Sequence, residues 1–142
     1  NRRTFDAAHL ARSVLEGTVL NLGYGFARMR ALGLRPSEIR ATGGGANSRL
    51  WLQVVADVFG APVVRTAEPE AAAYGAALQS IWSHERENGG AADIQEVVGA
   101  RLRLGRQVIS PRPGPAAAYE ALQERFNSLW RTLSREFGPR AG

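Results

Sequence analysis

Hydrophobic residues recur every three to five positions in three stretches of the chain, which is the spacing of one face of an α-helix. These stretches cover residues 4–34, 48–60 and 116–137. The pattern is most regular in the last of them, where the apolar positions are Tyr119, Leu122, Phe126, Leu129, Trp130, Leu133 and Phe137. We therefore expect three helices, of which the last is strongly amphipathic.

The ends of these helices carry residue types that favour capping. Thr4 and Asp6 are the candidates at the start of the first helix, and Gly33 lies where it would stop. Asn47 or Ser48 is expected to cap the second helix and Gly60 to end it. Three glycines lie inside the first helix, where each costs about 1 kcal/mol relative to alanine; they are Gly17, Gly23 and Gly25. They indicate either close approach of another backbone or a break near Gly23.

Short β-prone segments alternate with the helices. Strands are expected over residues 38–42 and 62–65, and a third long helix from about residue 70 to residue 84. A short helix over 93–101 and an extended stretch over 107–110 follow. This alternation predicts parallel strands joined by helices. Two strands make a poor sheet, so we expect further strands before Asn1 and interpret the chain as part of a larger domain.

Composition narrows the classes of protein and of site. The chain has 142 residues, 44% hydrophobic and 22% charged, which is typical of one globular domain or part of one. It has no cysteine, which excludes disulfides and cysteine nucleophiles. His9 and His84 have no acidic partners at metal-ligand spacing, so we predict no metal site and place both on the surface. No long apolar run or leader pattern occurs, and we expect a cytoplasmic protein without a membrane partner.

The charge is basic but dispersed. The net charge is +5, and all 18 basic residues are arginine, scattered from Arg2 to Arg140. Nucleic-acid binding sites usually gather basic residues on one face. We therefore expect no nucleic-acid partner, and a basic nucleic-acid-binding domain is the weaker alternative.

A glycine loop follows the first expected strand. Gly43, Gly44 and Gly45 lead from that strand to the start of the second helix, with Asn47 and Ser48 beside them. Glycine lets a ligand approach the backbone closely, and free N–H groups at a helix start favour anions. The loop matches neither the Walker A motif nor G-x-G-x-x-G. On spacing alone, a tight turn without a ligand is an equal alternative.

Residues 42–63 read TGGGANSRLWLQVVADVFGAPV. This segment resembles the C-terminal domain of the FGGY carbohydrate kinases, especially the xylulokinase branch, which carries T-G-G-G-A-x-S-x-x-W-x-Q-x-x-A-D-x-x-G-x-P-V. Residues 70–78, EAAAYGAAL, resemble the family's E-x-x-A-x-G-A-A-x helix, and residues 9–17 its R-A-x-x-E-G helix. The similarity extends over roughly residues 4–133.

The resemblance implies a fold and an ATP site. The fold would be α/β, a partial C-terminal domain of the actin-like ATPase (ribonuclease-H-like) class, helix-rich with short parallel strands. Residues 1–142 would form the C-terminal part of the nucleotide-binding domain, without the N-terminal sugar domain and the first strands. The ATP-binding residues would be Gly43, Gly44, Gly45, Asn47 and Ser48. Gly44 and Gly45 would lie near the ribose and α-phosphate, and Asn47 and Ser48 near the adenine.

The resemblance also implies an activity. The parent protein would transfer the γ-phosphate of ATP, with Mg²⁺, to a sugar hydroxyl, and xylulose is the expected sugar. Ribulose, fuculose, gluconate and glycerol are alternative substrates. The family's catalytic aspartate and phosphate loops match no position here, so we expect no catalytic residue in this chain and no activity of the chain alone. A non-catalytic actin-like nucleotide-binding or interaction module is the alternative, and exposed apolar faces favour a homo-oligomer.

Several single residues carry their own expectations. Asp57 is expected in a hydrogen-bonded structural role rather than in catalysis. Trp51 and Trp130 are expected in the core rather than as ligand platforms. Glu16 is either a cleft residue or a solvated or capping one. The helix over residues 70–78 is interpreted equally as a hinge or as alanine-rich packing.

Overall fold

The structure is a computed structural model that describes residues 6–68 and 70–137, apart from the side chain of Arg106. Its elements, in chain order, are α1 (Ala7–Ala31), β1 (Ile39–Ala41), the 3₁₀ helix η1 (Gly44–Asn47), α2 (Arg49–Phe59), β2 (Val63–Thr66), α3 (Ala71–Glu87), α4 (Ile94–Arg101), β3 (Leu104–Ile109) and α5 (Ala116–Phe137). Every expected helix is present. The extended stretch expected over residues 107–110 overlaps the end of a longer strand, β3.

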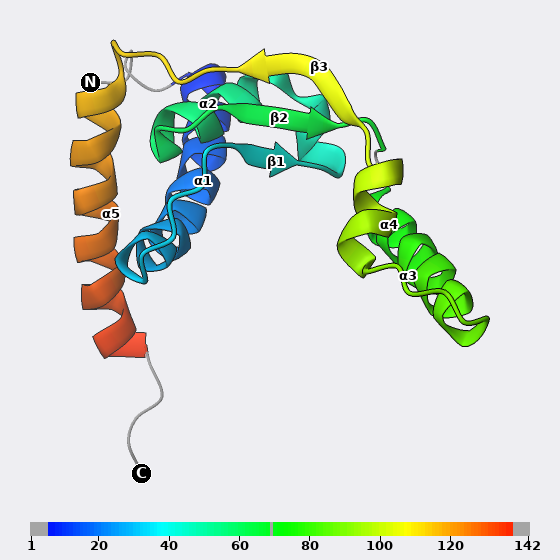
Figure 1. Ribbon diagram of the computed structural model, residues 1–142. Coiled ribbons are helices and arrows are strands. Elements are labelled where there is room, and N and C mark those ends of the chain that lie inside the picture. Colours follow the sequence, from blue (N-terminus) through cyan, green and yellow to red (C-terminus); the bar gives the residue numbers. More distant parts are fainter. Residues whose placement is uncertain (1–5, 69, 138–142) are drawn as a thin grey trace.

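The three strands form one sheet in the order β1-β2-β3. β1 and β2 run parallel, with Ile39 opposite Val63, which confirms the expected parallel pair. β3 runs antiparallel to β2, with Ile109 opposite Val63, so the sheet is mixed rather than wholly parallel. The antiparallel direction follows from the path of the chain, because β3 returns toward the main body after the α3–α4 hairpin (Figure 1).

The core lies between the sheet and three helices. α2 contacts β2 and β3, and α1 and α5 pack against α2 and against each other. The most deeply buried side chains are Val19 of α1, Val54 of α2 and Val63 of β2. Figure 1 shows α5 at one outer edge of the molecule and the α3–α4 hairpin at the opposite end. The sheet and the glycine loop lie between these two parts.

The helix ends explain why the boundaries could be predicted. Asp6 caps α1 by accepting the N–H of His9 at 2.9 Å, whereas Thr4 lies outside the described residues. The Ser48 hydroxyl caps α2 by accepting the N–H of Trp51 at 3.2 Å. Gly60 ends α2 in the left-handed conformation, with φ of 61°, which glycine adopts without steric cost.

α1 is continuous, so the break considered near Gly23 does not occur. Gly23 is instead a point of close approach, because a Cβ atom there would collide with Oε1 of Gln123 on α5. It would also lie 3.4 Å from Cγ1 of Val58 on α2. The neighbours are thus side chains of α5 and α2 rather than another backbone. Gly17 and Gly25 have no such neighbours within 4 Å among the described residues.

Trp51 and Trp130 differ in how far they are buried. Trp51 is half-buried and packs against the core cluster, which agrees with the expectation for it. Trp130 is 41% exposed and stacks beside Tyr24, with ring centroids 4.9 Å apart. The expectation of a core position was wrong for Trp130, because it lies at the rim of the contact between α1 and α5. His9 and His84 are exposed, as predicted.

No helix in the stretches 6–68 and 70–137 is long and apolar enough to span a bilayer.

Candidate nucleotide site

The glycine loop is a tight turn between β1 and α2. Gly43 has a positive φ of 81°, a conformation that residues with a Cβ rarely adopt. The N–H of Ala46 donates to the carbonyl of Gly43 at 3.0 Å, and the N–H of Ser48 donates to that of Gly45 at 3.0 Å. These bonds wind residues Gly44–Asn47 into one turn of 3₁₀ helix. The sequence therefore needs glycine here for the turn itself, whether or not a ligand binds.

The second and third glycines of the loop have different surroundings. Gly44 is exposed, and a Cβ added there would meet no described atom within 4 Å. A Cβ on Gly45 would touch the Trp51 ring at 3.4 Å. The backbone of Gly44 is consequently open to a ligand, whereas one side of Gly45 is packed against Trp51.

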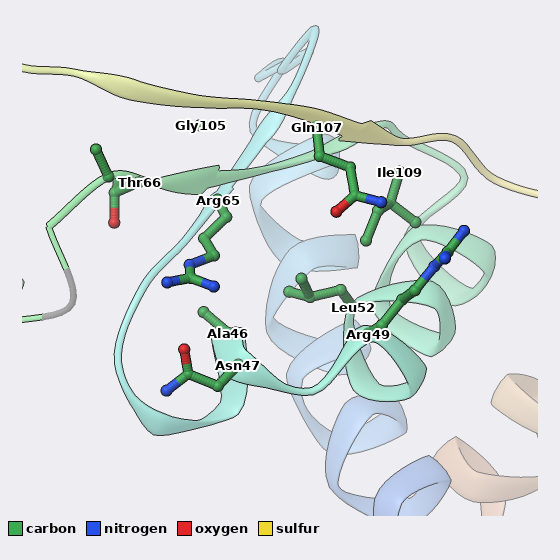
Figure 2. Close-up of a pocket in the computed structure, with 10 residues that line it drawn as sticks. Ala46, Asn47, Arg49, Leu52, Arg65, Thr66, Gly105, Gln107 and Ile109 are labelled. Atoms are coloured by element: carbon green, nitrogen blue, oxygen red, sulfur yellow. The ribbon is translucent and has the colours of Figure 1, made fainter.

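A cavity of about 290 Å³ lies beside this loop (Figure 2). Because β1 and β2 are parallel, their carboxyl ends share one edge of the sheet, and both η1 and the end of β2 line the cavity there. This edge is where open α/β sheets bind their ligands. Of the five predicted ATP-binding residues, Asn47 lines the cavity, while Gly43, Gly44, Gly45 and Ser48 form the loop outside its lining.

Two arginines give the cavity positive charge. Arg49 is the first residue of α2 and Arg65 lies in β2. Neither has a hydrogen-bond or ion-pair partner among the residues that the structure describes. Figure 2 shows Arg65 and Asn47 pointing toward one another, with Leu52 between them and Arg49. Unpaired guanidinium groups beside a helix start favour an anionic ligand.

Sequence reasoning missed these cavity residues, which also include Thr66 and Gln107. A signal existed for Arg49, because a cation in the first turn of a helix opposes the helix dipole unless an anion is nearby. Arg65 also carried a signal, since it closes a predicted strand at the edge where ligands bind. Gln107 carried no comparable signal, because its position depends on the pairing of β3 with β2.

Asp57 does not line the cavity; it connects α2 to the turn before α5. Its carboxylate is buried and accepts the Arg112 backbone N–H at 2.7 Å and the Arg112 guanidinium at 2.7 and 3.0 Å. Nε2 of Gln53 donates to it at 3.0 Å. Burial by itself raises the pKa of Asp57, but the hydrogen bonds from Arg112 and Gln53 outweigh it, so the pKa lies below its ordinary value. These contacts confirm the hydrogen-bonded role expected for Asp57.

Glu16 joins two helices. It accepts the Tyr119 hydroxyl of α5 at 2.8 Å and Nε of Arg12 at 2.8 Å. Burial, together with the hydrogen bond to Glu16, raises the pKa of Tyr119. Glu16 is therefore a bridge between α1 and α5, a role that differs from those considered for it from the sequence.

In the described part of the chain, no three His, Asp or Glu side chains come together in a way that could hold a metal ion.

The chain is similar in sequence to known carbohydrate kinases. A family model described as the C-terminal domain of the FGGY family of carbohydrate kinases matches residues 2–84, more than half of the chain. A xylulose kinase of Haemophilus influenzae is 42% identical over 80 residues, which cover 56% of this chain and 16% of that protein.

Solved structures show the same likeness. The crystal structure of xylulose kinase from Rhodospirillum rubrum superposes with a TM-score of 0.75 at 31% identity, covering 94% of this chain and 26% of that one. A gluconate kinase from Lactobacillus acidophilus gives 0.76 at 26% identity, covering 91% and 25%. The chain thus spans about a quarter or less of these relatives, and the expected fold, a partial actin-like C-terminal domain, is confirmed.

Proposed function

The chain belongs to the FGGY family of carbohydrate kinases, and on that premise we propose that it is the ATP-binding C-terminal part of an enzyme that phosphorylates a sugar hydroxyl. The match over residues 2–84 carries the proposal, because it includes the glycine loop, α2 and β2. In the reaction, the γ-phosphorus of ATP forms a bond to the sugar oxygen, its bond to the β,γ-bridging oxygen breaks, and ADP leaves. The hydroxyl proton passes to a base, which we place outside residues 1–142.

The loop would bind the nucleotide mainly through its backbone. Gly43, Gly44 and Gly45 would let the ribose and α-phosphate approach, and the exposed, unobstructed position of Gly44 supports this. The amide of Asn47 and the hydroxyl of Ser48 would face the adenine. Ser48 can serve both roles, since its oxygen accepts the bond from Trp51 while its O–H hydrogen is left to donate.

The charge of the cavity fits this assignment. Arg65 lines the cavity beside the loop (Figure 2) and would supply positive charge to the nucleotide phosphates. Mg²⁺ accompanies ATP in the proposed reaction. The described residues bring together no carboxylate cluster that fits a metal ion, so we assign this chain no step through it.

The proposed sugar is xylulose, because relatives that match this chain include xylulose kinases. The likeness to a gluconate kinase makes gluconate the competitor to test. We propose that the 142-residue chain alone transfers no phosphate, since the sugar domain would be supplied by the remainder of a longer protein. A coupled assay checks the sugar and the inactivity of the chain alone. The longer protein should show a higher kcat/KM for xylulose than for gluconate, and the isolated chain should show no turnover. Faster gluconate turnover would overturn the sugar assignment.

The ATP site is tested with Gly44→Asp. A Cβ at Gly44 would meet no described atom within 4 Å, so we expect the fold to accept a side chain there, while the added carboxylate repels phosphate and occupies the open approach. We expect MgATP affinity, measured by isothermal titration calorimetry on the 142-residue chain, to fall at least about tenfold.

Gly25→Asp is the matched control. It places the same charge on an exposed glycine of α1 that likewise has no described neighbour within 4 Å, so affinity should not change. Unaltered affinity in the Gly44→Asp variant would remove the loop from the ATP site. ATP binding without turnover in the longer protein would favour the non-catalytic module instead.

A further inference from the structure

The loop between α3 and α4 contains an asparagine followed directly by a glycine, Asn88–Gly89. Asn88 caps the C-terminal end of α3, and both residues are exposed to solvent. Gly89 has a positive φ of 83°, and a Cβ added there would meet no described atom within 4 Å. Figure 1 shows this loop at the outer tip of the α3–α4 hairpin. The pair is therefore open to water and lies in a turn rather than in regular structure.

An asparagine before a glycine has a chemistry of its own. The side-chain amide carbon of asparagine is an electrophile, and the backbone nitrogen of the next residue can attack it and close a succinimide ring. A Cβ on that next residue hinders the attack, and glycine has none. Glycine also adopts a wider range of backbone angles than other residues, which makes ring closure easier. Asparagine is consequently most reactive in this way when glycine follows it.

The other asparagines of the described residues lack this arrangement. Asn21 precedes leucine within α1, and Asn127 precedes serine within α5, so regular helix holds the backbone at both positions. Oδ1 of Asn127 also accepts Nε2 of Gln123 at 2.9 Å. Asn47 precedes serine in η1. Within the stretches 6–68 and 70–137, Asn88 alone combines exposure, a turn and a following glycine.

The contacts that hold Asn88 in place are few and lie at the surface. Its Nδ2 donates to the His84 carbonyl at 2.8 Å, and the N–H of Gly89 donates to the Arg86 carbonyl at 3.2 Å. Both bonds must open before the Gly89 nitrogen can reach Cγ of Asn88. Exposed hydrogen bonds at the end of a helix open readily, because water replaces the lost partners. The turn therefore slows ring closure without preventing it.

We propose that Asn88 is a site of spontaneous deamidation, which converts it to aspartate or isoaspartate. The Gly89 nitrogen forms a bond to Cγ of Asn88 and loses its proton, the Cγ–Nδ2 bond breaks, and Nδ2 takes up a proton and leaves as ammonia. Water then opens the ring and returns a proton to the Gly89 nitrogen. Addition of water at Cγ gives aspartate, whereas addition at the Asn88 backbone carbonyl carbon gives isoaspartate, in which the main chain passes through the side chain.

Deamidation loosens the α3–α4 hairpin. The product has no Nδ2 donor for the His84 carbonyl, and its carboxylate adds negative charge at the negative end of the α3 dipole. Isoaspartate also inserts a methylene group into the backbone of a crowded turn. The N–H of Gly90 donates to the Glu85 carbonyl oxygen there at 2.8 Å, and a Cβ on Gly90 would lie only 2.7 Å from that oxygen.

This modification is separate from nucleotide binding. The cavity beside the glycine loop is lined by residues of η1, α2, β2 and β3 and by Ala67 after β2, whereas Asn88 lies at the end of α3. The proposal therefore stands or falls independently of the ATP site.

Peptide mass spectrometry of the 142-residue chain, incubated at several pH values, tests the chemistry. Digestion with pepsin in acid keeps the reaction from occurring during the measurement. The Asn88 peptide should gain the mass difference between a hydroxyl and an amino group, at least about tenfold faster than the peptides of Asn47 and Asn127. The rate should rise with pH, because the attacking Gly89 nitrogen must lose its proton. Equal rates at the three asparagines, or a rate at Asn88 that does not depend on pH, would overturn the proposal.

Asn88→Gln is the matched control, since it keeps an exposed amide but its longer side chain closes a ring much more slowly. It should stay unmodified under the same incubation. Hydrogen exchange should become at least about twofold faster in α3 and α4 of the incubated unaltered chain, and should not change in incubated Asn88→Gln. Asn88→Asp should show faster exchange before any incubation. Conversion of Asn88 without faster exchange, or equal acceleration in Asn88→Gln, would show that deamidation does not loosen the hairpin.

Discussion

At the scale of single residues, Asp57 shows how a polar contact connects distant parts of this fold. Its buried carboxylate in α2 binds the backbone and the guanidinium of Arg112, which lies in the turn between β3 and α5. A buried charge is tolerated only when it is paired and hydrogen-bonded, as here. The contact therefore fixes the turn that directs α5 back onto α1 and α2.

Replacing Asp57 by Asn should be strongly destabilising near neutral pH. The change removes the charge that Arg112 faces, and we expect the free energy of unfolding to fall by about 2–4 kcal/mol. Because the folded pKa of Asp57 is below its ordinary value, its contribution is present above the unfolded pKa and is lost as pH falls through the folded pKa. Urea unfolding near pH 7 and near pH 3 should therefore show a smaller loss on acidification in Asp57→Asn than in the unaltered chain.

The exposed ion pair between Arg40 and Glu38 provides the control for that experiment. Its atoms are 2.8 Å apart, but both side chains are in contact with solvent. Glu38→Gln should change the free energy of unfolding by less than about 0.5 kcal/mol. If Asp57→Asn cost no more than Glu38→Gln, the structural role of Asp57 would be rejected.

Two glycines of α1 should respond in opposite directions to the same change. Gly23→Ala places a methyl group against Oε1 of Gln123, so the Gln123 amide must turn aside and its hydrogen bond to the Leu20 carbonyl is weakened; we expect a loss of about 0.5–1 kcal/mol. Gly25→Ala meets no described atom within 4 Å and should gain about 0.5–1 kcal/mol from helix propensity. Thermal or urea unfolding of both variants checks this, and equal effects would show that α1 and α5 are not in close contact at Gly23.

The sequence indicates the environment of such residues but does not reveal which residues they contact. Asp57 falls inside a helical pattern among apolar residues, which predicts a buried, bonded carboxylate. Its partner Arg112 could not be predicted, because it is one of many scattered arginines in the sequence. Trp130 was misplaced for a related reason: periodicity gives the apolar side of α5, but α1 covers only part of that side.

At the scale of elements, α3 and α4 form a hairpin at the end of the sheet away from α5 (Figure 1). Leu78 and Val97 are buried between them. The Tyr74 hydroxyl donates to the Arg101 carbonyl at 2.8 Å, and Nε1 of Trp82 donates to the Ala92 carbonyl at 3.1 Å. With so few buried side chains, this hairpin should open more readily than α2.

Tyr74→Phe tests whether the hairpin opens as its own unit. The variant leaves the Arg101 carbonyl without this donor, and we expect a loss of about 0.5–1.5 kcal/mol that is confined to α3 and α4. Hydrogen exchange followed by mass spectrometry should show faster exchange in these two helices and unchanged exchange in α2. Tyr24→Phe is the control on α1, and a uniform increase across the chain would contradict a separate unit.

Element boundaries were predictable where local chemistry sets them. Asp6, Ser48 and Gly60 act on their own neighbours in sequence, and the structure uses all three as caps. β3 was harder, because its first half, residues 104–106, has no apolar alternation. Its extended form depends on pairing with β2, a long-range contact that no local pattern reveals.

At the scale of the whole molecule, one part of the candidate site is set by neighbouring residues in the chain and the other part by long-range strand pairing. The glycine loop was predictable because strand, turn and helix start are contiguous in the chain. Arg65 carried a weaker signal from its place at the end of a predicted strand, whereas Gln107 carried none, because the antiparallel pairing of β3 with β2 brings it to the loop. Arg49 and Arg65, the unpaired arginines that line this cavity, are the basic residues that the proposed function uses.

The remaining positive charge is dispersed and partly neutralised. Arginines take part in ion pairs with carboxylates in α1, β1, α4 and the turn before α5; the pairs are Arg12–Glu16, Arg40–Glu38, Arg101–Glu85 and Arg112–Asp57. Others donate to backbone carbonyls, as Arg30 does to Phe59 at 2.9 Å. A net charge of +5 distributed in this way gives no concentrated stripe for a phosphate backbone.

We therefore expect weak, sequence-independent DNA binding with a shallow salt dependence. Each phosphate contact steepens the plot of log Kobs against log salt by about 0.9, so a slope shallower than about −2 would correspond to two contacts or fewer. Fluorescence anisotropy with a short duplex at several salt concentrations measures it. Arg65→Gln serves as the matched variant: it should weaken MgATP binding, because Arg65 lines the cavity, yet leave the DNA slope unchanged. A slope steeper than about −5 would instead mean that several arginines act together on one surface, and the basic nucleic-acid-binding alternative would then displace the kinase proposal as the explanation of the charge.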